Sequence, residues 1–202
     1  MIVKVCGIKT QTNYSAVSEL EIDMIGLNFY PHSKRFVGEK LIDDILTQKQ
    51  RVGVFVNETL EKVLKMAKLH DLDYIQLHGN ESPSYCQTLK EKHRIIMVFS
   101  IETETDLQKT KEYNFCDYFL FDTKTPLYGG SGKKFDWKIL DAYTDNVGFL
   151  IAGGIGPQDF KMINDIDHPQ FKGIDINSKF EDAPGLKNIE MIKQFLKDIK
   201  HD

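Results

Sequence analysis

The sequence has few cysteines, no long apolar run and no excess of positive charge. The three cysteines among 202 residues, Cys6, Cys86 and Cys116, are widely spaced and form no C-x-x-C pair, so neither a disulfide framework nor a zinc site is indicated. No stretch approaches the ~18 apolar residues that a membrane helix requires, and the N-terminus shows no signal peptide. We therefore expect no membrane partner and a reducing, cytoplasmic location.

The charges also exclude some functions. The net charge is −4, and acidic and basic residues are interspersed, so the overall field does not favour nucleic acid or an anionic membrane. Any phosphate site must then be local, built from backbone amides and a few cations. The histidines and acids form no motif such as H-E-x-x-H, so we expect no metal.

Short apolar runs alternate with helix-like segments along the whole chain. The runs are nearly continuously apolar, as expected for parallel strands covered on both faces; they lie at residues 2–6, 24–29, 51–56, 74–77, 95–99, 118–121, 148–152 and 173–176. Eight such strands predict an α/β fold, a single compact (β/α)8 TIM barrel spanning residues 1–202 as one domain. An open doubly wound sheet is the alternative, but no G-x-G-x-x-G follows the first strand.

The segments between the strands predict helices of unequal quality. Residues 60–67 have an apolar face at helical spacing, and Ser82 precedes a proline in the manner of a helix N-cap. Residues 186–199 predict a closing helix, and residues 102–114 give the weakest helical pattern. Because the chain is shorter than the typical ~250 residues of a TIM barrel, we expect one or more truncated helices.

Several of the predicted strands end at residues suited to chemistry. The first ends at Cys6-Gly7, the fourth at His78-Gly79, the sixth at Asp122 and the seventh at Gly153-Gly154. A glycine-rich segment at 129–132 follows Asp122 and leaves room for a ligand above the strand end. In a barrel these ends meet on one face, so they predict one site assembled from several loops.

Cys6 is a candidate functional residue, because it lies at the C-terminal end of a predicted strand, just before a glycine. Lys4 lies two residues earlier, so both side chains point to the same strand face. A nearby ammonium favours the thiolate and would lower the pKa of Cys6. The alternative is that Cys6 is a small core residue, the common fate of a lone cysteine.

Asp122 is the candidate acid. It follows a run of aromatic and aliphatic residues, and partial burial there would raise its pKa, which suits a general acid. The alternative is an aspartate that caps a helix or ties a loop.

Backbone suited to phosphate follows or occupies the last two predicted strands. Gly153, Gly154 and the segment from Gly173 to Ser178 lie where barrels often bind phosphate through backbone amides, although Gly-Gly is also common in ordinary tight turns. Arg35, after the second strand, suits a carboxylate or phosphate, or else lies in a solvated basic loop.

One of the six histidines is a candidate site residue. His78 ends the fourth strand, where it either contacts a substrate or serves the structure alone. The others lie in polar surroundings, and we expect them at the surface: His32, His70, His93, His168 and His201.

Taken in order, these segments resemble the phosphoribosylanthranilate isomerase family of tryptophan biosynthesis. The resemblance covers nearly the whole chain and is carried by Lys4-Val5-Cys6-Gly7, Gly26-Leu27-Asn28-Phe29, Ser33-Lys34-Arg35, Val52-Gly53-Val54-Phe55-Val56-Asn57, Gln76-Leu77-His78-Gly79, Asp122, Gly129-Gly130-Ser131-Gly132, Phe135-Asp136-Trp137, Ala152-Gly153-Gly154, Asp175-Ile176-Asn177-Ser178 and Pro184-Gly185.

The resemblance implies an Amadori rearrangement of a small sugar-phosphate substrate, without cofactor or metal, by a monomer or homodimer. Asp122 would be the general acid and Cys6 the general base. Arg35 would hold the substrate carboxylate, and His78 and Asp175 would line the site. Gly153, Gly154 and Ser178 would hold the phosphate.

The chain departs from the family pattern at two positions. Lys179 stands where a glycine usually follows the serine of the last strand motif, and Asn188 replaces the usual acid at the start of the last helix, where an asparagine can still act as a cap. Lys179 adds a cation near the expected phosphate site, and it adds a Cβ where a glycine would permit close backbone approach or a left-handed φ.

Three other functions stay open at this stage. A histidine-pathway isomerase would use carboxylates at both catalytic strand ends, and an indole-glycerol-phosphate synthase would carry a catalytic lysine and an extra N-terminal segment. An inactive phosphate-binding protein is the third, and the presence of both Cys6 and Asp122 argues against it.

Overall fold

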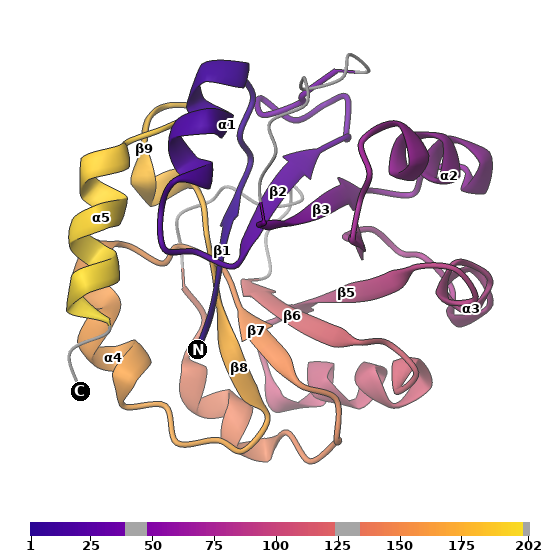
Figure 1. The fold of residues 1–202 in the computed structure, drawn as a ribbon. Coiled ribbons are helices and arrows are strands. Elements are labelled where there is room, and N and C mark those ends of the chain that lie inside the picture. The colour runs from indigo at the N-terminus through magenta and orange to yellow at the C-terminus, as the bar shows by residue number, and fades with distance from the viewer. Residues whose placement is uncertain (39–47, 124–133, 200–202) are drawn as a thin grey trace.

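The strands form a closed barrel in a computed structural model that describes residues 1–38, 48–123 and 134–199 (Figure 1). Each strand pairs in parallel with its neighbours in sequence, and β1 also pairs with β8, which closes the sheet. The predicted (β/α)8 barrel is therefore confirmed. The strands are β1 (Ile2–Cys6), β2 (Met24–Asn28), β3 (Gln50–Phe55), β4 (Tyr74–Leu77), β5 (Arg94–Ile101), β6 (Tyr118–Thr123), β7 (Phe149–Ile151) and β8 (Phe171–Ile176).

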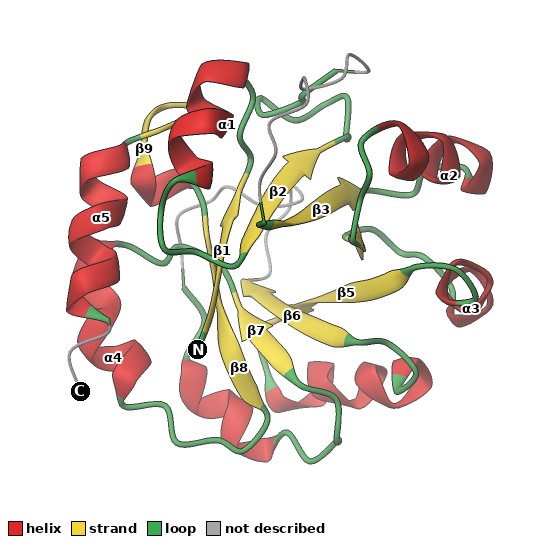
Figure 2. Ribbon diagram, viewed as in Figure 1, coloured by secondary structure: helices red, strands yellow, loops and turns green. Residues whose placement is uncertain are grey.

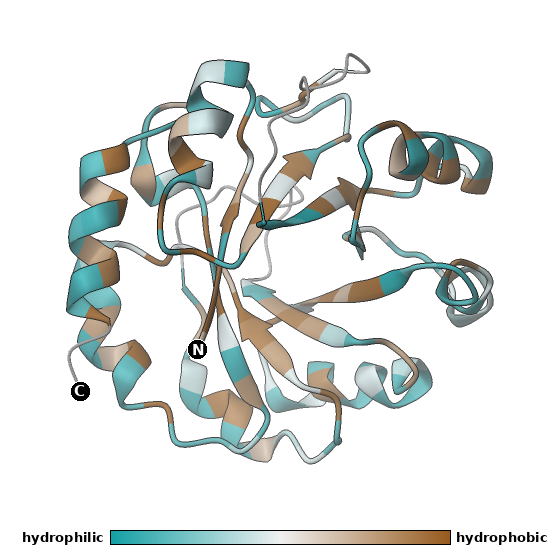
Figure 3. Cartoon of the chain, in the orientation of Figure 1, coloured by the Kyte–Doolittle hydropathy of each residue, from teal (hydrophilic) through white to brown (hydrophobic). Residues whose placement is uncertain are grey.

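The barrel has two apolar layers because each strand is apolar on both faces. A larger layer lies between the strands and the surrounding helices. A smaller one fills the barrel and consists of Met24, Val52, Tyr74, Ile96, Val98, Leu120, Leu150 and Ala152. Figure 3 shows the strands as largely hydrophobic, whereas α5 alternates hydrophobic and hydrophilic residues. Side chains that share a strand face with the inner layer, two residues further along, are thus directed to the C-terminal mouth of the barrel.

The helices cover the outside of the strands (Figure 2). The α-helices are α1 (Gln11–Ser18), α2 (Leu60–Leu69), α3 (Pro83–Lys90), α4 (Phe160–Asn164) and α5 (Ile189–Asp198). Four 3₁₀ segments are also described: η1 (Glu104–Tyr113), η2 (Trp137–Ala142), η3 (Pro157–Asp159) and η4 (Ser178–Phe180). The helix at 60–67 and the Ser82 cap are confirmed, since Ser82 Oγ accepts a hydrogen bond from Tyr85 N at 3.2 Å.

The weak helical pattern at 102–114 corresponds to η1, and η2 and the five-residue α4 are short, so the expected truncation is confirmed. The closing helix begins later than predicted. Gly185 has a φ of +88° and turns the chain, so that β9 (Glu181–Ala183) and β10 (Leu186–Lys187) form a two-stranded antiparallel sheet. Asn188 then caps α5, accepting from Met191 N at 2.9 Å, as expected of an asparagine.

Closure between β1 and β8 depends on a close backbone approach at Gly173. A Cβ there would lie 1.9 Å from the backbone oxygen of Ile2, which cannot move without disturbing the strand pair. We expect Gly173→Ala to lower the free energy of unfolding by about 3 kcal/mol, measured by urea denaturation. Gly148→Ala is the matched control, because the nearest atom to its Cβ belongs to the flexible side chain of Lys172. Equal stabilities of the two variants would contradict this account.

Candidate active site

Cys6, Lys4 and Asp175 meet inside the C-terminal end of the barrel. Lys4 is in register with Asp175 across the β1–β8 pair, and its Nζ lies 2.7 Å from Asp175 Oδ2. Cys6 is on the same strand face, and a Cβ on Gly26 would lie 2.6 Å from its Sγ, so the glycine on β2 makes room for the thiol. All three side chains are buried, Lys4 completely. The structure thus places an ion pair directly beneath the candidate base.

The expected lowering of the pKa of Cys6 is wrong. Burial raises the pKa of the thiol above its ordinary value and outweighs the opposing effects of Lys4 and Lys187; the Asp175 carboxylate adds to the increase. Lys4 does act in the predicted direction, but the sequence did not show how deeply Cys6 is buried or that a carboxylate lies beside it. Burial also favours a neutral Lys4, yet Asp175 and Cys6 together raise the pKa of its ammonium.

The raised pKa of Cys6 should move the pH dependence of its alkylation to higher pH. Only the thiolate reacts, so we expect the iodoacetamide rate to rise through a midpoint above the ordinary thiol pKa of about 8.5. Peptide mass spectrometry assigns the modification to Cys6. Cys86 and Cys116 serve as internal controls, since burial raises the pKa of each to about 12. A midpoint at or below the ordinary value would mean that the two lysines outweigh burial.

Asp122 lies at the mouth on β6, again on the inner face, two residues after the core residue Leu120. Its Oδ1 accepts a hydrogen bond from Thr123 N at 2.8 Å, and its Oδ2 lies 3.3 Å from Nε2 of His78 at the end of β4. Burial, with a contribution from Asp122, raises the pKa of Asp175. Two candidates from distant parts of the sequence, His78 and Asp122, are therefore in contact, and Asp122 also acts electrostatically on Asp175.

Gly153 and Gly154 follow β7 in the left-handed region, with φ of +85° and +66°. A Cβ on Gly153 would lie 2.2 Å from Thr123 Oγ1 and 2.8 Å from Asp122 Oδ1, so this turn lies directly against the candidate acid. A residue with a side chain would collide there as well as strain the backbone. Ser178 begins η4 after β8 and is partly exposed. The expected phosphate-binding backbone is thus at the same end of the barrel as Cys6 and Asp122.

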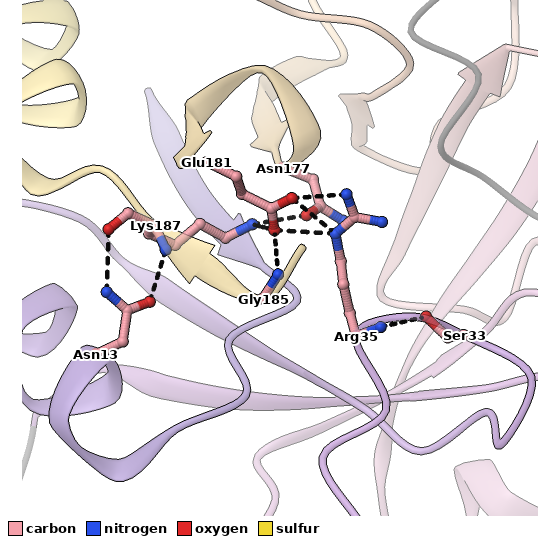
Figure 4. Close-up of polar contacts among 7 residues, drawn as sticks. All are labelled: Asn13, Ser33, Arg35, Asn177, Glu181, Gly185 and Lys187. Carbon is pink, nitrogen blue, oxygen red and sulfur yellow. Dashed lines mark hydrogen bonds and ion pairs between the residues drawn. The ribbon is translucent and has the colours of Figure 1, made fainter. Parts of the chain in front are cut away.

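Arg35 takes part in a charge cluster that sequence reasoning missed (Figure 4). Its Nε and Nη2 donate to the carboxylate of Glu181, and Lys187 Nζ contacts Glu181 Oε1 at 2.5 Å and Asn177 Oδ1 at 2.6 Å. We call these four residues, Arg35, Asn177, Glu181 and Lys187, the Arg35 cluster. The Pro184-Gly185 turn between two short segments was the signal for the β9–β10 hairpin that carries two of them.

Two further expectations concern single residues. His70 is buried, not at the surface, because it ends α2 against Phe29, with ring centroids 4.8 Å apart.

Lys179 is exposed and is not among the residues with positive φ, so the lysine causes no left-handed strain there. The glycine-rich segment at 129–132 lies outside the described residues.

Within the described part of the chain, no group of three or more histidine, cysteine or acidic side chains is arranged to hold a metal ion. In the same residues, no helix is both long and apolar enough to cross a membrane.

The closed parallel barrel, with ionisable side chains and glycine turns gathered at the C-terminal strand ends, defines a (β/α)8-barrel enzyme. A family model described as N-(5'-phosphoribosyl)anthranilate (PRA) isomerase matches residues 3–198. The chain belongs to this family of isomerases, which interconvert an aldose and a ketose in tryptophan biosynthesis. This membership favours the isomerase over the two other barrel enzymes considered from the sequence.

Individual members of the family are similar to this chain over almost its whole length. The isomerase of Parabacteroides distasonis is 47% identical over 208 residues, covering 100% of this chain and 94% of its own. Monomers generated from the dimeric Thermotoga maritima enzyme have 30% identity and a TM-score of 0.81, with 99% of each chain covered. A further family member, solved with reduced 1-(o-carboxyphenylamino)-1-deoxyribulose 5-phosphate, has 29% identity and a TM-score of 0.79, again with 99% of each chain covered.

Proposed function

We propose that this chain converts N-(5-phosphoribosyl)anthranilate into 1-(2-carboxyphenylamino)-1-deoxyribulose 5-phosphate, with Asp122 as general acid and Cys6 as general base. The observation that carries the proposal is the placement of these two buried groups on the inner face of the barrel, at the C-terminal ends of β6 and β1. The relative solved with the reduced product supports the substrate class.

Ring opening is the step assigned to Asp122. In its protonated form it gives its proton to the furanose ring oxygen as the bond from that oxygen to C1 breaks. The electron pair on the anthranilate nitrogen then forms an iminium with C1. His78, whose Nε2 lies 3.3 Å from Asp122 Oδ2, helps to hold the carboxyl group in place.

Proton removal is the step assigned to Cys6. Its thiolate takes the proton from C2, and the electron pair of that bond neutralises the iminium to give an enolamine. The enolamine becomes the ketone as C1 gains a proton and the C2 hydroxyl loses one. A thiolate with a raised pKa is a stronger base once formed, which suits the removal of a proton from carbon.

The remaining residues bind the substrate in this proposal. Arg35 contacts the anthranilate carboxylate, because a guanidinium matches a carboxylate in shape and charge. Backbone amides around Gly153, Gly154 and Ser178 bind the phosphate, and Asp175 lines the site between Lys4 and Asp122. The reaction requires neither cofactor nor metal.

We also propose one barrel domain, a cytoplasmic location and a homodimer rather than a monomer. The three cysteines are free and buried, as suits a reducing compartment. The dimeric T. maritima relative supports the assembly, which analytical ultracentrifugation tests.

The direct test is to identify the product. The purified protein is incubated with N-(5-phosphoribosyl)anthranilate made in situ, and the products are analysed by chromatography and NMR. A new C2 ketone in a compound of unchanged mass supports the proposal. Anthranilate and free ribose 5-phosphate as the sole products would show spontaneous hydrolysis and overturn it.

A further inference from the structure

Glu181 contacts Arg35 in a way that fixes the direction of the guanidinium. The carboxylate lies along one edge of the group: Nε is 2.9 Å and 3.1 Å from the two oxygens, and Nη2 is 2.6 Å from Oε2. Figure 4 shows the remaining guanidinium nitrogen turned away from Glu181. Among the described residues, Nη1 has no hydrogen-bond partner. A guanidinium can bind carboxylates at two edges, so one edge is available to a second planar anion.

Glu181 is itself held firmly. Its side chain is only 4% exposed, and Oε1 accepts from Gly185 N at 3.1 Å as well as from Lys187 Nζ. Lys187 is completely buried and anchored through its backbone, since Lys187 N donates to Asn13 Oδ1 at 2.8 Å. Burial favours a neutral Glu181, but hydrogen bonds from Arg35 and the charge of Lys187 hold its pKa below the ordinary value. Glu181 is therefore a rigid, ionised support.

The stem of Arg35 passes next to the candidate base. A Cβ on Gly7 would lie 2.6 Å from Arg35 Cδ and 2.9 Å from Asn177 Oδ1, and Gly7 directly follows Cys6. Gly7 has a φ of +80°, so a glycine both permits the turn and leaves space for the arginine. Arg35 therefore lies at the C-terminal end of β1, against the residue that directly follows Cys6.

The charges of the Arg35 cluster do not balance internally. Arg35 and Lys187 are two cations, and within the described residues Glu181 is the anion that contacts both. Glu181 therefore compensates a buried ammonium and orients the guanidinium without neutralising the pair. A net positive charge at a partly buried site favours the binding of an anion.

We propose that Glu181 is a positioning residue that presents the Nη1–Nη2 edge of Arg35 to the aryl carboxylate of the substrate and so sets the preference for carboxylate-bearing substrates. This inference rests on the proposed function. It concerns specificity, because Glu181 acts through Arg35 and takes no part in the acid–base steps assigned to Cys6 and Asp122.

The test compares two ligands that differ only in the carboxylate. One is reduced 1-(o-carboxyphenylamino)-1-deoxyribulose 5-phosphate, and the other carries an unsubstituted phenyl ring. Calorimetry gives the Kd of each, and their ratio measures carboxylate recognition. We expect Glu181→Gln to lower this ratio about tenfold, because a charge-assisted contact loses its orientation. The Kd of the phenyl ligand should change less than about twofold, whereas a merely structural loss would weaken both ligands alike.

Three variants complete the design. Arg35→Ala should bring the ratio close to one by weakening the carboxylate ligand. Glu190→Gln is the control, since Glu190 is an exposed residue of α5 that pairs with Lys193. Should Glu181→Gln fail to fold because Lys187 stays buried without its anion, the double variant Glu181→Gln/Lys187→Met removes both charges and should show the same tenfold loss.

Failure of the proposed isomerase function and failure of the role of Glu181 give different results in this experiment. If the wild type binds neither ligand, the proposed function fails. If the wild type prefers the carboxylate ligand and Glu181→Gln keeps the full ratio, Glu181 does not position Arg35. A lower Kd of the carboxylate ligand for Glu181→Gln than for the wild type would also overturn the inference. Glu181 would then compete with the ligand carboxylate for Arg35.

Discussion

Replacing Cys6 with alanine should lower kcat about a thousandfold while KM changes little. The substitution removes the group assigned to take the C2 proton, and general base catalysis typically contributes between about 10² and 10⁴ in rate. Cys6 lies at the end of β1 among buried groups, and alanine fits its space, so the barrel should remain folded. The measurement is steady-state turnover, followed by the change in anthranilate fluorescence.

Cys86→Ala provides the matched control for this variant. Cys86 is also a buried cysteine, but it lies in α3 on the outside of the barrel. Its replacement should cost some stability and leave kcat near that of the wild type. A Cys6→Ala variant that is folded and keeps more than about a tenth of the wild-type kcat would remove Cys6 as the base.

Replacing Asp122 with asparagine should have an effect of similar size for a different reason. Asparagine has the same shape and can still accept the hydrogen bond from Thr123 N, but its amide cannot protonate the ring oxygen. We expect kcat/KM to fall between about 10²- and 10⁴-fold. Binding of the reduced product, measured by calorimetry, should stay close to that of the wild type, because that ligand needs no ring opening.

The control for this variant is Asp165→Asn, an exposed aspartate at the end of α4. It should behave as the wild type in both assays. If Asp122→Asn turned over substrate normally, the acid would have to be another group. If it lost ligand binding as well as turnover, Asp122 would hold the substrate instead of acting as the acid.

The sequence predicted the barrel because burial of parallel strands on both faces leaves a local pattern, a short and nearly continuous apolar run. All of the predicted strands are present within a few residues of their expected ends. The helices were less predictable. The segment at 102–114 forms a 3₁₀ helix, and residues 186–187 form a strand, because the turn at Gly185 separates them from α5.

Only part of the candidate site could be predicted from the sequence. Cys6, His78, Asp122 and Gly153 could be chosen because each stands at a strand end, and a barrel brings strand ends together. The predicted shift of the Cys6 pKa had the wrong direction, because the depth at which a side chain is buried depends on the tertiary structure and not on its neighbours in sequence. The contact between Arg35 and Glu181 joins residues 146 positions apart, and no local pattern marks it.

The most direct test of the central claim is turnover of phosphoribosylanthranilate, made in situ, by the wild type, Cys6→Ala and Asp122→Asn at equal concentrations of folded protein. The account predicts rapid loss of the substrate fluorescence with the wild type and a rate close to spontaneous hydrolysis with either variant. Turnover above about a tenth of the wild-type rate in either folded variant would contradict the acid–base pair. A wild type with no turnover of live substrate would contradict the isomerase itself.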